Sequence, residues 1–346
     1  MVSADALRPL PKAELHQHLD GSVRPATAVE LAGSMGLTLD PEDVRRRMVG
    51  PEQCSNQAEL LTFFDLPIQL LQTEEALSRV TAELVEDLMA DGVRYAEIRW
   101  APRLHLQQGL SVPAVIEAVV SGIARAAQKH GPAMPLIGLI VTAMRSHPPA
   151  ANVKLAHAAA AFGPPIVGFD LAGPELAWPA PPHAAAFNAA RAGGLALTAH
   201  AGEAPGADRV REVLEFGISR VAHGVSASED ESLIRLLRAR DITLDLCPTS
   251  NVQAGVVADL ASHPLADLHR AGVSVTISSD SRTVTGASLT DELARTATAL
   301  ALTRDELATV ALNAFARAFA PPPVIAPMRA AAALAWDAWR LEPDIS

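Results

Sequence analysis

The sequence predicts an α/β fold: a (β/α)8 barrel of the TIM type, with extra helices between its first and second strands, over the barrel mouth. Short apolar, β-branched runs alternate with longer amphipathic stretches of helical period along the 346 residues, which is typical of a parallel sheet. Eight such runs are present, the number that closes a barrel. Ionisable residues gather where these runs stop, at the strand ends that carry the chemistry of such barrels.

The eight expected strands follow one another without any short sequence repeat. They cover residues 13–19, 94–99, 135–141, 166–170, 195–199, 220–222, 243–246 and 274–277. Amphipathic stretches such as 74–92 lie between them and predict the outer helices. The long interval 21–73 predicts the extra helices, and its segment LLTFFDL (60–66) fits either an apolar gate or ordinary core. No break in composition divides residues 1–346, which we expect to form one domain.

Composition argues against several partners and locations. The formal net charge is −11, and an acidic surface repels phosphate backbones, which argues against nucleic acid as a partner. No run of about 18 uncharged apolar residues is present, so we expect no membrane span. The start lacks the pattern of a signal peptide, and the two cysteines, Cys54 and Cys247, show no CxxC spacing. These features predict a cytoplasmic protein.

Two histidines one residue apart, His16 and His18, end the first expected strand in the segment ELHQHLDGS. Alternate residues of a strand share one face, so both imidazoles project together, while Leu15, Gln17 and Leu19 face the other way. Two imidazoles held in this way can bind one zinc-like ion, at Zn–N distances of about 2.0–2.1 Å. A hydrogen-bonded pair of histidines in a polar barrel mouth is the alternative that this motif alone leaves open.

Three further strand ends favour the metal. His200 ends the fifth expected strand, and His223 ends the sixth. Asp280 follows the eighth, and Glu203 stands three positions after His200. The ion would leave a position for water, whose pKa it lowers toward about 7. His223 is then placed to orient that water or take its proton, and Glu203 to donate a proton next to the attacked atom. The predicted ligand set is His16, His18, His200 and Asp280.

Six motifs occur in one order along the chain: PKAELHQHLDGS, FDLAGPE, TAHAGE, RVAHGV, LCPTSNV and ISSDS. Together, from about Pro9 to about Ala320, they resemble the adenosine deaminase family of the amidohydrolase superfamily. The resemblance implies a metallo-dependent hydrolase barrel that acts on the C–N bond of a cyclic amidine. Its reaction would be zinc-dependent hydrolytic deamination of adenosine or 2′-deoxyadenosine to inosine or 2′-deoxyinosine and ammonia, by attack of zinc hydroxide on purine C6.

The resemblance also implies roles for the motif residues. One Zn²⁺ per chain would be bound by the ligand set above, Glu203 would protonate purine N1, and His223 would orient or deprotonate the attacking water. Asp20 would contact the sugar hydroxyls, and Gly173 would let its backbone approach the N3 side of the purine. The expected partner is thus a small purine nucleoside, and no oligomeric state follows. The expected substrate contacts are His18, Asp20, Gly173 and Ser281.

One position departs from the family pattern. The family commonly has two adjacent acids after the last strand and then proline, whereas here Asp280 is followed by Ser281 and Arg282. The second acid binds purine N7 in the family; serine can also donate to N7, but it is neutral and shorter. The alternative is therefore a deaminase of a related aminopurine: adenine, an N6-substituted adenine, 6-aminodeoxyfutalosine or a nucleoside of specialised metabolism.

Two alternatives of other classes remain. A binuclear amidohydrolase would need a bridging lysine or glutamate near the end of the fourth strand, where IVGFDLAG offers only Asp170. A purine-binding protein that had lost catalysis would not need the complete ligand and acid set. We expect Cys247 and the rest of CPTSN (247–251) to be structural. The remaining histidines, among them His105 and His263, are expected to be surface or capping residues.

Overall fold

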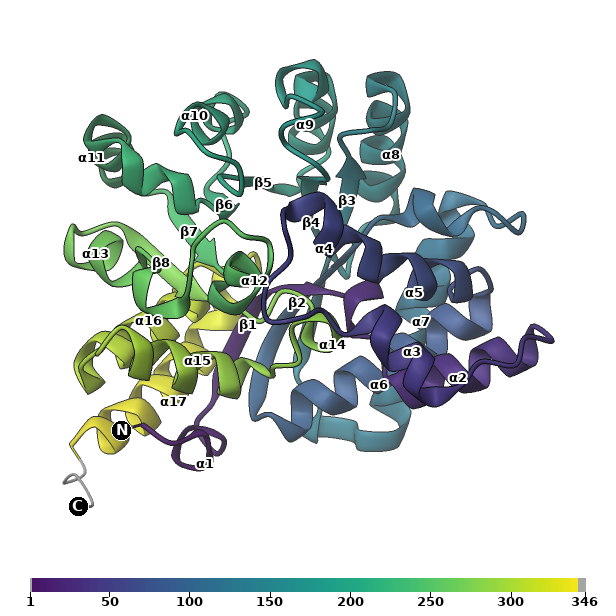
Figure 1. The fold of residues 1–346 in the computed structure, drawn as a ribbon, viewed down its shortest axis with the longest axis horizontal. Helices are drawn as coiled ribbons and strands as arrows, with labels where there is room; N and C mark the ends of the chain where they lie inside the picture. Colours follow the sequence, from purple (N-terminus) through teal and green to yellow (C-terminus); the bar gives the residue numbers. More distant parts are fainter. Residues whose placement is uncertain (1, 342–346) are drawn as a thin grey trace.

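Eight parallel strands form one sheet in this computed structural model, which describes residues 2–341 (Figure 1). Their order in the sheet is their order in the chain. A parallel bridge between Gln17 and Asp280 brings the two edges of the sheet together. The predicted barrel is confirmed. The strands are β1 (Lys12–His18), β2 (Val93–Trp100), β3 (Leu136–Met144), β4 (Ile166–Ala172), β5 (Ala196–Ala201), β6 (Arg220–His223), β7 (Thr243–Leu246) and β8 (Ser274–Ile277).

Helices cover the outside of the barrel, because each parallel strand needs a crossover that returns to the start of the next. The crossover helices are α6 (Glu74–Ala90), α7 (Val112–His130), α8 (Pro149–Phe162), α9 (Ala184–Ala192), α10 (Asp208–Leu214), α11 (Glu231–Ala239) and α13 (Leu265–Arg270). The chain begins with α1 (Ala4–Leu7) and continues after β8 with α15 (Leu289–Ala299), α16 (Arg304–Ala316) and α17 (Pro322–Arg340). Within residues 2–341, no helix combines the length and apolar character needed to cross a bilayer.

Local sequence signals explain where these elements begin and why they are buried. Thr73 caps α6 by accepting a hydrogen bond from the Ala76 N–H. Glu74 and Glu75 stand in its first turn, near the positive end of the helix dipole. Strand β2 is buried at all positions but one, since a barrel strand is covered by the interior on one face and by helices on the other. The buried strands therefore hold the polar residues at their ends in fixed positions.

The extra helices expected between the first two strands are present. Figure 1 shows them in dark purple and blue across the face of the barrel, beside α12 (Pro248–Gln253) and α14 (Arg282–Thr285). Leu61 and Phe64 from this region line the cavity at the barrel mouth. We name residues 41–71 the cover segment. It follows α2 (Pro25–Ser34) and contains α3 (Pro41–Met48), α4 (Gln57–Leu61) and α5 (Asp65–Leu70).

The cover segment is attached in two ways. Its ends are buried in the main core through Val44, Met48, Leu66, Leu70 and Leu71, whereas its middle packs in a small, separate apolar cluster. Cys54 and Leu60 of this segment pack with Ala254 and Val284, which lie on the chain near α12 and α14. The N–H of Gly50 also donates a hydrogen bond to the carbonyl of Val284 at 2.9 Å. The middle of the cover segment thus depends on few buried contacts, whereas its two ends share the large core of the barrel strands.

Candidate metal centre and active site

Three imidazole rings converge at the C-terminal ends of β1 and β5. The Nε2 atoms of His16 and His18 lie 3.2 Å apart, and the Nε2 atom of His200 lies 3.1 Å from the first and 3.2 Å from the second. Three nitrogens that bind one zinc ion at about 2.0–2.1 Å in tetrahedral geometry would lie about 3.3 Å from one another. The dimensions of this triangle therefore fit zinc.

Burial favours the metal-binding form of these rings. It lowers the pKa of His16 well below its usual value, and the positive charge of Arg99 adds to the effect. Burial likewise lowers the pKa of His18 to about 3. Both imidazoles are neutral at physiological pH as a result, and a neutral imidazole is the form that binds a metal.

Asp280 lies beside the triangle, directly after β8. Its Oδ1 atom is 3.4 Å from His18 Nε2 and 3.7 Å from His16 Nε2. Its backbone carbonyl accepts hydrogen bonds from the N–H of His18 and the side-chain amide of Gln17, at 2.7 and 2.9 Å. Asp280 has a φ of +59°, and His223 has a φ of +66°. Residues with a Cβ rarely adopt this conformation, which concentrates at functional sites because the surroundings there impose it.

A buried carboxylate orients one of the rings from behind. His200 Nδ1 lies 3.1 Å from Asp170 Oδ1 on β4, and Asp170 Oδ2 accepts a hydrogen bond from Thr142 Oγ1 at 3.1 Å. This contact places the proton of neutral His200 on Nδ1 and leaves Nε2 free for a metal. The sequence showed Asp170 only as an acid at a strand end. Its contact with His200 could not be predicted, because that contact forms only when β4 and β5 lie side by side in the barrel.

Glu203 and His223 face the triangle from the ends of β5 and β6. Glu203 Oε1 is 3.5 Å from His223 Nε2, and Glu203 Oε2 accepts a hydrogen bond from the side chain of Gln57 at 2.7 Å. Burial raises the pKa of Glu203 well above its usual value, and the negative charges of Glu175 and Asp280 raise it further. The carboxyl group can therefore hold a proton near neutral pH, as a general acid must.

A cavity of about 250 Å³ opens onto these groups. Asp20, Gly173 and Ser281, the expected substrate contacts besides His18, all line it. Gly173 has a φ of +112°, which a residue without a Cβ adopts readily. Burial raises the pKa of Asp20 to about 6. The Ser281 hydroxyl donates a hydrogen bond to Asp280 Oδ1 at 3.2 Å. The structure thus brings the expected substrate contacts and the expected ligands to one place.

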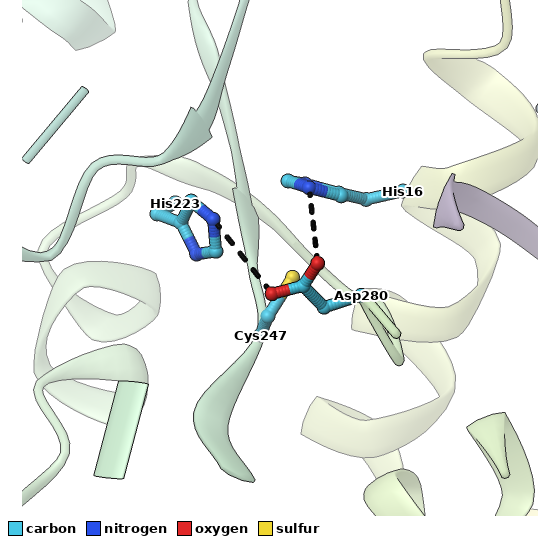
Figure 2. A group of neighbouring side chains, drawn as sticks. All are labelled: His16, His223, Cys247 and Asp280. Carbon is cyan, nitrogen blue, oxygen red and sulfur yellow. Dashed lines mark ion pairs between the residues drawn. The ribbon is translucent and has the colours of Figure 1, made fainter. Parts of the chain in front are cut away.

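Cys247 adjoins this group but has the properties of a structural residue. Figure 2 shows its sulfur beside the side chains of His16, His223 and Asp280, a second set of atoms close enough to bind one ion. Burial raises the pKa of the Cys247 thiol well above its usual value, which disfavours the thiolate that binds metals or attacks substrates. The triangle of imidazole nitrogens is therefore the better candidate for the metal site.

Of the expectation that His105 and His263 are surface or capping residues, the surface part is wrong and the capping part is confirmed. His105 bonds to a carbonyl at the C-terminal end of α5, and His263 Nδ1 accepts from the N–H of Leu265 at the start of α13. Both rings are buried. His105 Nδ1 lies 2.9 Å from the carbonyl oxygen of Leu71, and His263 Nε2 lies 3.2 Å from Asn251 Oδ1. These partners come from loops and short helices without a periodic pattern, so the sequence carried no signal for either contact. Gln57, which bonds to Glu203, was missed for the same reason.

The family model for adenosine deaminase matches residues 11–330 of the chain. The chain belongs to the adenosine deaminase family. The protein is therefore a hydrolase that acts on C–N bonds in cyclic amidines, and its family is metal-dependent. The resemblance of the six sequence motifs to this family is confirmed.

Relatives in the adenosine deaminase family cover most of the chain. An adenosine deaminase of Enterococcus faecalis is 35% identical over 319 residues, which are 91% of this chain and 94% of that protein. An adenosine deaminase of Clostridium perfringens is 38% identical over 289 residues, which are 82% of this chain and 86% of that protein. A solved adenine deaminase from Arthrobacter aurescens is 28% identical, with a TM-score of 0.86, and the match covers 93% of this chain and 98% of that one.

Proposed function

We propose that this protein is a zinc-dependent aminohydrolase that converts adenosine and 2′-deoxyadenosine to inosine and 2′-deoxyinosine, with release of ammonia. The observation that carries the proposal is the triangle of Nε2 atoms of His16, His18 and His200, at 3.1–3.2 Å, beside the buried carboxyl group of Glu203. Relatives named adenosine deaminase, at 35–38% identity, support the choice of substrate. The free, buried Cys54 and Cys247 fit the cytoplasmic location that we also propose.

One zinc ion per chain is part of the proposal. The ligands would be the three histidines of the triangle and Asp280, whose Oδ1 lies nearest to His18. When bound, the ion would act as the Lewis acid that makes water nucleophilic near neutral pH. A zinc-bound amidohydrolase from Burkholderia ambifaria has the same fold, with a TM-score of 0.87 at 24% identity, and the match covers 98% of this chain and 94% of that one.

The remaining side chains would each have one role in deamination. Glu203 would donate a proton to ring N1, which makes the neighbouring C6 more electrophilic. His223, whose Nε2 atom faces the carboxylates of Glu203 and Asp280, would lie beside the attacking water. It would either orient this water or accept its proton. The water oxygen would add to C6 first. The C6–N bond would then break as the added hydroxyl gives its proton to the amino group, which leaves as ammonia while the C6 carbonyl forms. Asp20 and the backbone at Gly173 would contact the sugar and the N3 side of the purine.

A second candidate is a related aminopurine, and one contact favours it. The Ser281 hydroxyl donates to Asp280, so in this arrangement it gives its only proton to a carboxylate and not to a purine nitrogen. Structural relatives are named for other aminopurines: the adenine deaminase above, and an N6-methyl-AMP deaminase from Arabidopsis thaliana at 26% identity and a TM-score of 0.84, covering 97% of this chain and 98% of that one.

The test is a deamination assay of zinc-loaded protein, with release of ammonia or alkylamine measured for adenosine, 2′-deoxyadenosine, adenine and N6-methyladenosine. We expect the two nucleosides to be the best substrates. Failure of both, with the zinc content verified, would overturn the proposal. The variant Ser281→Asp, with the exposed Ser34→Asp as control, should change the ratio of kcat/KM for adenosine to that for adenine. An unchanged ratio would show that position 281 does not determine the substrate.

A further inference from the structure

A chain of three hydrogen bonds leads from the backbone N–H of Leu265 through His263 and Asn251 to His223. The N–H of Leu265 donates to Nδ1 of His263 at 3.2 Å. A backbone N–H is only ever a donor, so this Nδ1 carries no proton. Burial lowers the pKa of His263 to about 3, which keeps the ring neutral. The single ring proton of His263 must therefore lie on Nε2.

The proton on Nε2 of His263 determines how the side-chain amide of Asn251 is oriented. Its Oδ1 lies 3.2 Å from Nε2 of His263, and its Nδ2 lies 3.0 Å from Nδ1 of His223. Oxygen and nitrogen of an amide are often exchangeable in a structure and must be assigned from their partners. Here the assignment is forced, because the protonated Nε2 of His263 needs an acceptor. The amide oxygen faces His263, so the amide N–H faces His223.

His223 then has one possible neutral form. Its Nδ1 accepts from Asn251, so its proton lies on Nε2. Nε2 points toward carboxylates, with Glu203 Oε1 at 3.5 Å and Asp280 Oδ2 at 4.0 Å, and Figure 2 shows the ring facing Asp280. A nitrogen that already bears a proton cannot take another from water while the chain stays intact.

We propose that Asn251 and His263 are positioning residues that hold His223 in the form protonated at Nε2, so that His223 acts on the reacting water as a hydrogen-bond donor and not as a base. Of the two roles that the sequence left open for His223, the hydrogen-bond chain selects that of orienter. Its catalytic meaning rests on the proposed deamination, whereas the position of the proton follows from the contacts alone. The proton of the water would pass instead to a carboxylate, for which Asp280 Oδ2 lies 4.0 Å from His223 Nε2. A donor at this place would stabilise the negative charge that the oxygen gains as it loses that proton.

The position of the proton can be measured directly. Protein labelled with ¹⁵N-histidine and loaded with zinc gives long-range ¹H–¹⁵N spectra that distinguish a protonated from a bare ring nitrogen. The variants His223→Gln and His263→Gln assign the two sets of signals. We expect both rings to be neutral and protonated on Nε2. A His223 ring with a bare Nε2, or with both nitrogens protonated at neutral pH, would overturn the inference.

The variant Asn251→Asp tests whether Asn251 sets this form. A carboxylate can only accept, so the proton of His223 should move to Nδ1, while His263 should stay protonated on Nε2 and serve as an internal control. The exposed Asn188→Asp is the matched control and should change neither ring. A His223 that stays protonated on Nε2 alone in Asn251→Asp would overturn the role of Asn251. If this variant does not fold, the spectrum of the wild-type protein still decides where the proton lies.

Kinetics of the same variant test the consequence for catalysis. We expect Asn251→Asp to lose about 10²-fold in kcat, the order of one lost proton-handling group, with little change in KM and an unchanged zinc content. An unaltered kcat, with the proton of His223 moved, would show that the donor role is wrong. If the wild-type protein deaminates no purine at all, the proposed function fails, but the spectra still test the hydrogen-bond chain.

Discussion

The strand ends and the cover segment line the same cavity, but they are held in different ways. His16 and His200 lie on strands within the main core, and the two residues are 0% and 5% exposed. Gln57 of the cover segment is half-buried on a five-residue helix, next to the exposed Asn56 and Ala58. Groups that must keep a fixed geometry lie on rigid strands, whereas Gln57 lies on the short middle helix of the cover segment, which the small apolar cluster supports.

Gln57 connects the two regions. Its side-chain amide donates to Glu203 Oε2 at 2.7 Å. The same two residues also line a neighbouring hollow of about 510 Å³, between the cover segment and the loops that follow β5 and β6. Their hydrogen bond therefore holds the cover segment against the acid and separates the two spaces. The comparison predicts severe effects from changes at the strand ends and moderate ones from changes in the cover segment.

The largest expected effect is that of His16→Ala. Removing one corner of the nitrogen triangle should abolish stable zinc binding and reduce deamination to the limit of detection, because the strand ends cannot shift to replace the ligand. Metal content by mass spectrometry and turnover are the measurements. His157→Ala, at an exposed position of α8, is the control. Full zinc content in His16→Ala would remove His16 from the ligand set.

Glu203→Gln should lower kcat by about 10²–10⁴-fold, because an amide of the same shape cannot transfer a proton to the purine. Zinc should be retained, which separates this variant from the loss of a ligand. The exposed Glu215→Gln should behave as wild type. Turnover that survives in Glu203→Gln would mean that the proton comes from another group.

Gln57→Ala should lower kcat/KM by about tenfold or less, since it removes one hydrogen bond between the cover segment and Glu203. This bond favours the ionised carboxylate and lowers the pKa of Glu203, so its loss should raise that pKa further. Glu203 would then stay protonated to higher pH, and the alkaline limb of the pH profile of kcat/KM should shift to higher pH. Gln53→Ala, exposed in the same segment, is the control. An alkaline limb that shifts to lower pH would show that the hydrogen bond from Gln57 does not lower the pKa of Glu203.

The smallest effect on activity is expected from two substitutions that compare the stability of the two regions. Leu244→Ala, in β7, removes fully buried core atoms and should cost about 2–5 kcal/mol in the free energy of unfolding. Leu60→Ala removes the same atoms from the small cluster and should cost less, because the cover segment can move into the gap. Urea denaturation measures both values. Proteolysis within residues 41–71 should become faster in Leu60→Ala alone. Equal costs would mean that both regions belong to one rigid unit.

The sequence predicted what local patterns encode. The spacing of His16 and His18 shows that both share a strand face, and the apolar run before Asp280 shows where β8 ends. Contacts between distant segments carried no such signal. Gln57 and Glu203 are 146 positions apart, and their hydrogen bond depends on how the cover segment lies over the barrel. The buried state of His263 likewise depends on the packing of short helices after β7.

The bridge between Gln17 and Asp280 has a consequence for biosynthesis. On the proposed ligand set, the side chains that bind the cation come from the first strand to be translated, from the fifth, and from the residues directly after the last. A ribosome must therefore deliver about four-fifths of the polypeptide before the complete coordination sphere exists. Tight uptake of the cation then reports that the barrel has closed, so a nascent or truncated chain should stay metal-free and be recognisable to the cell as unfinished.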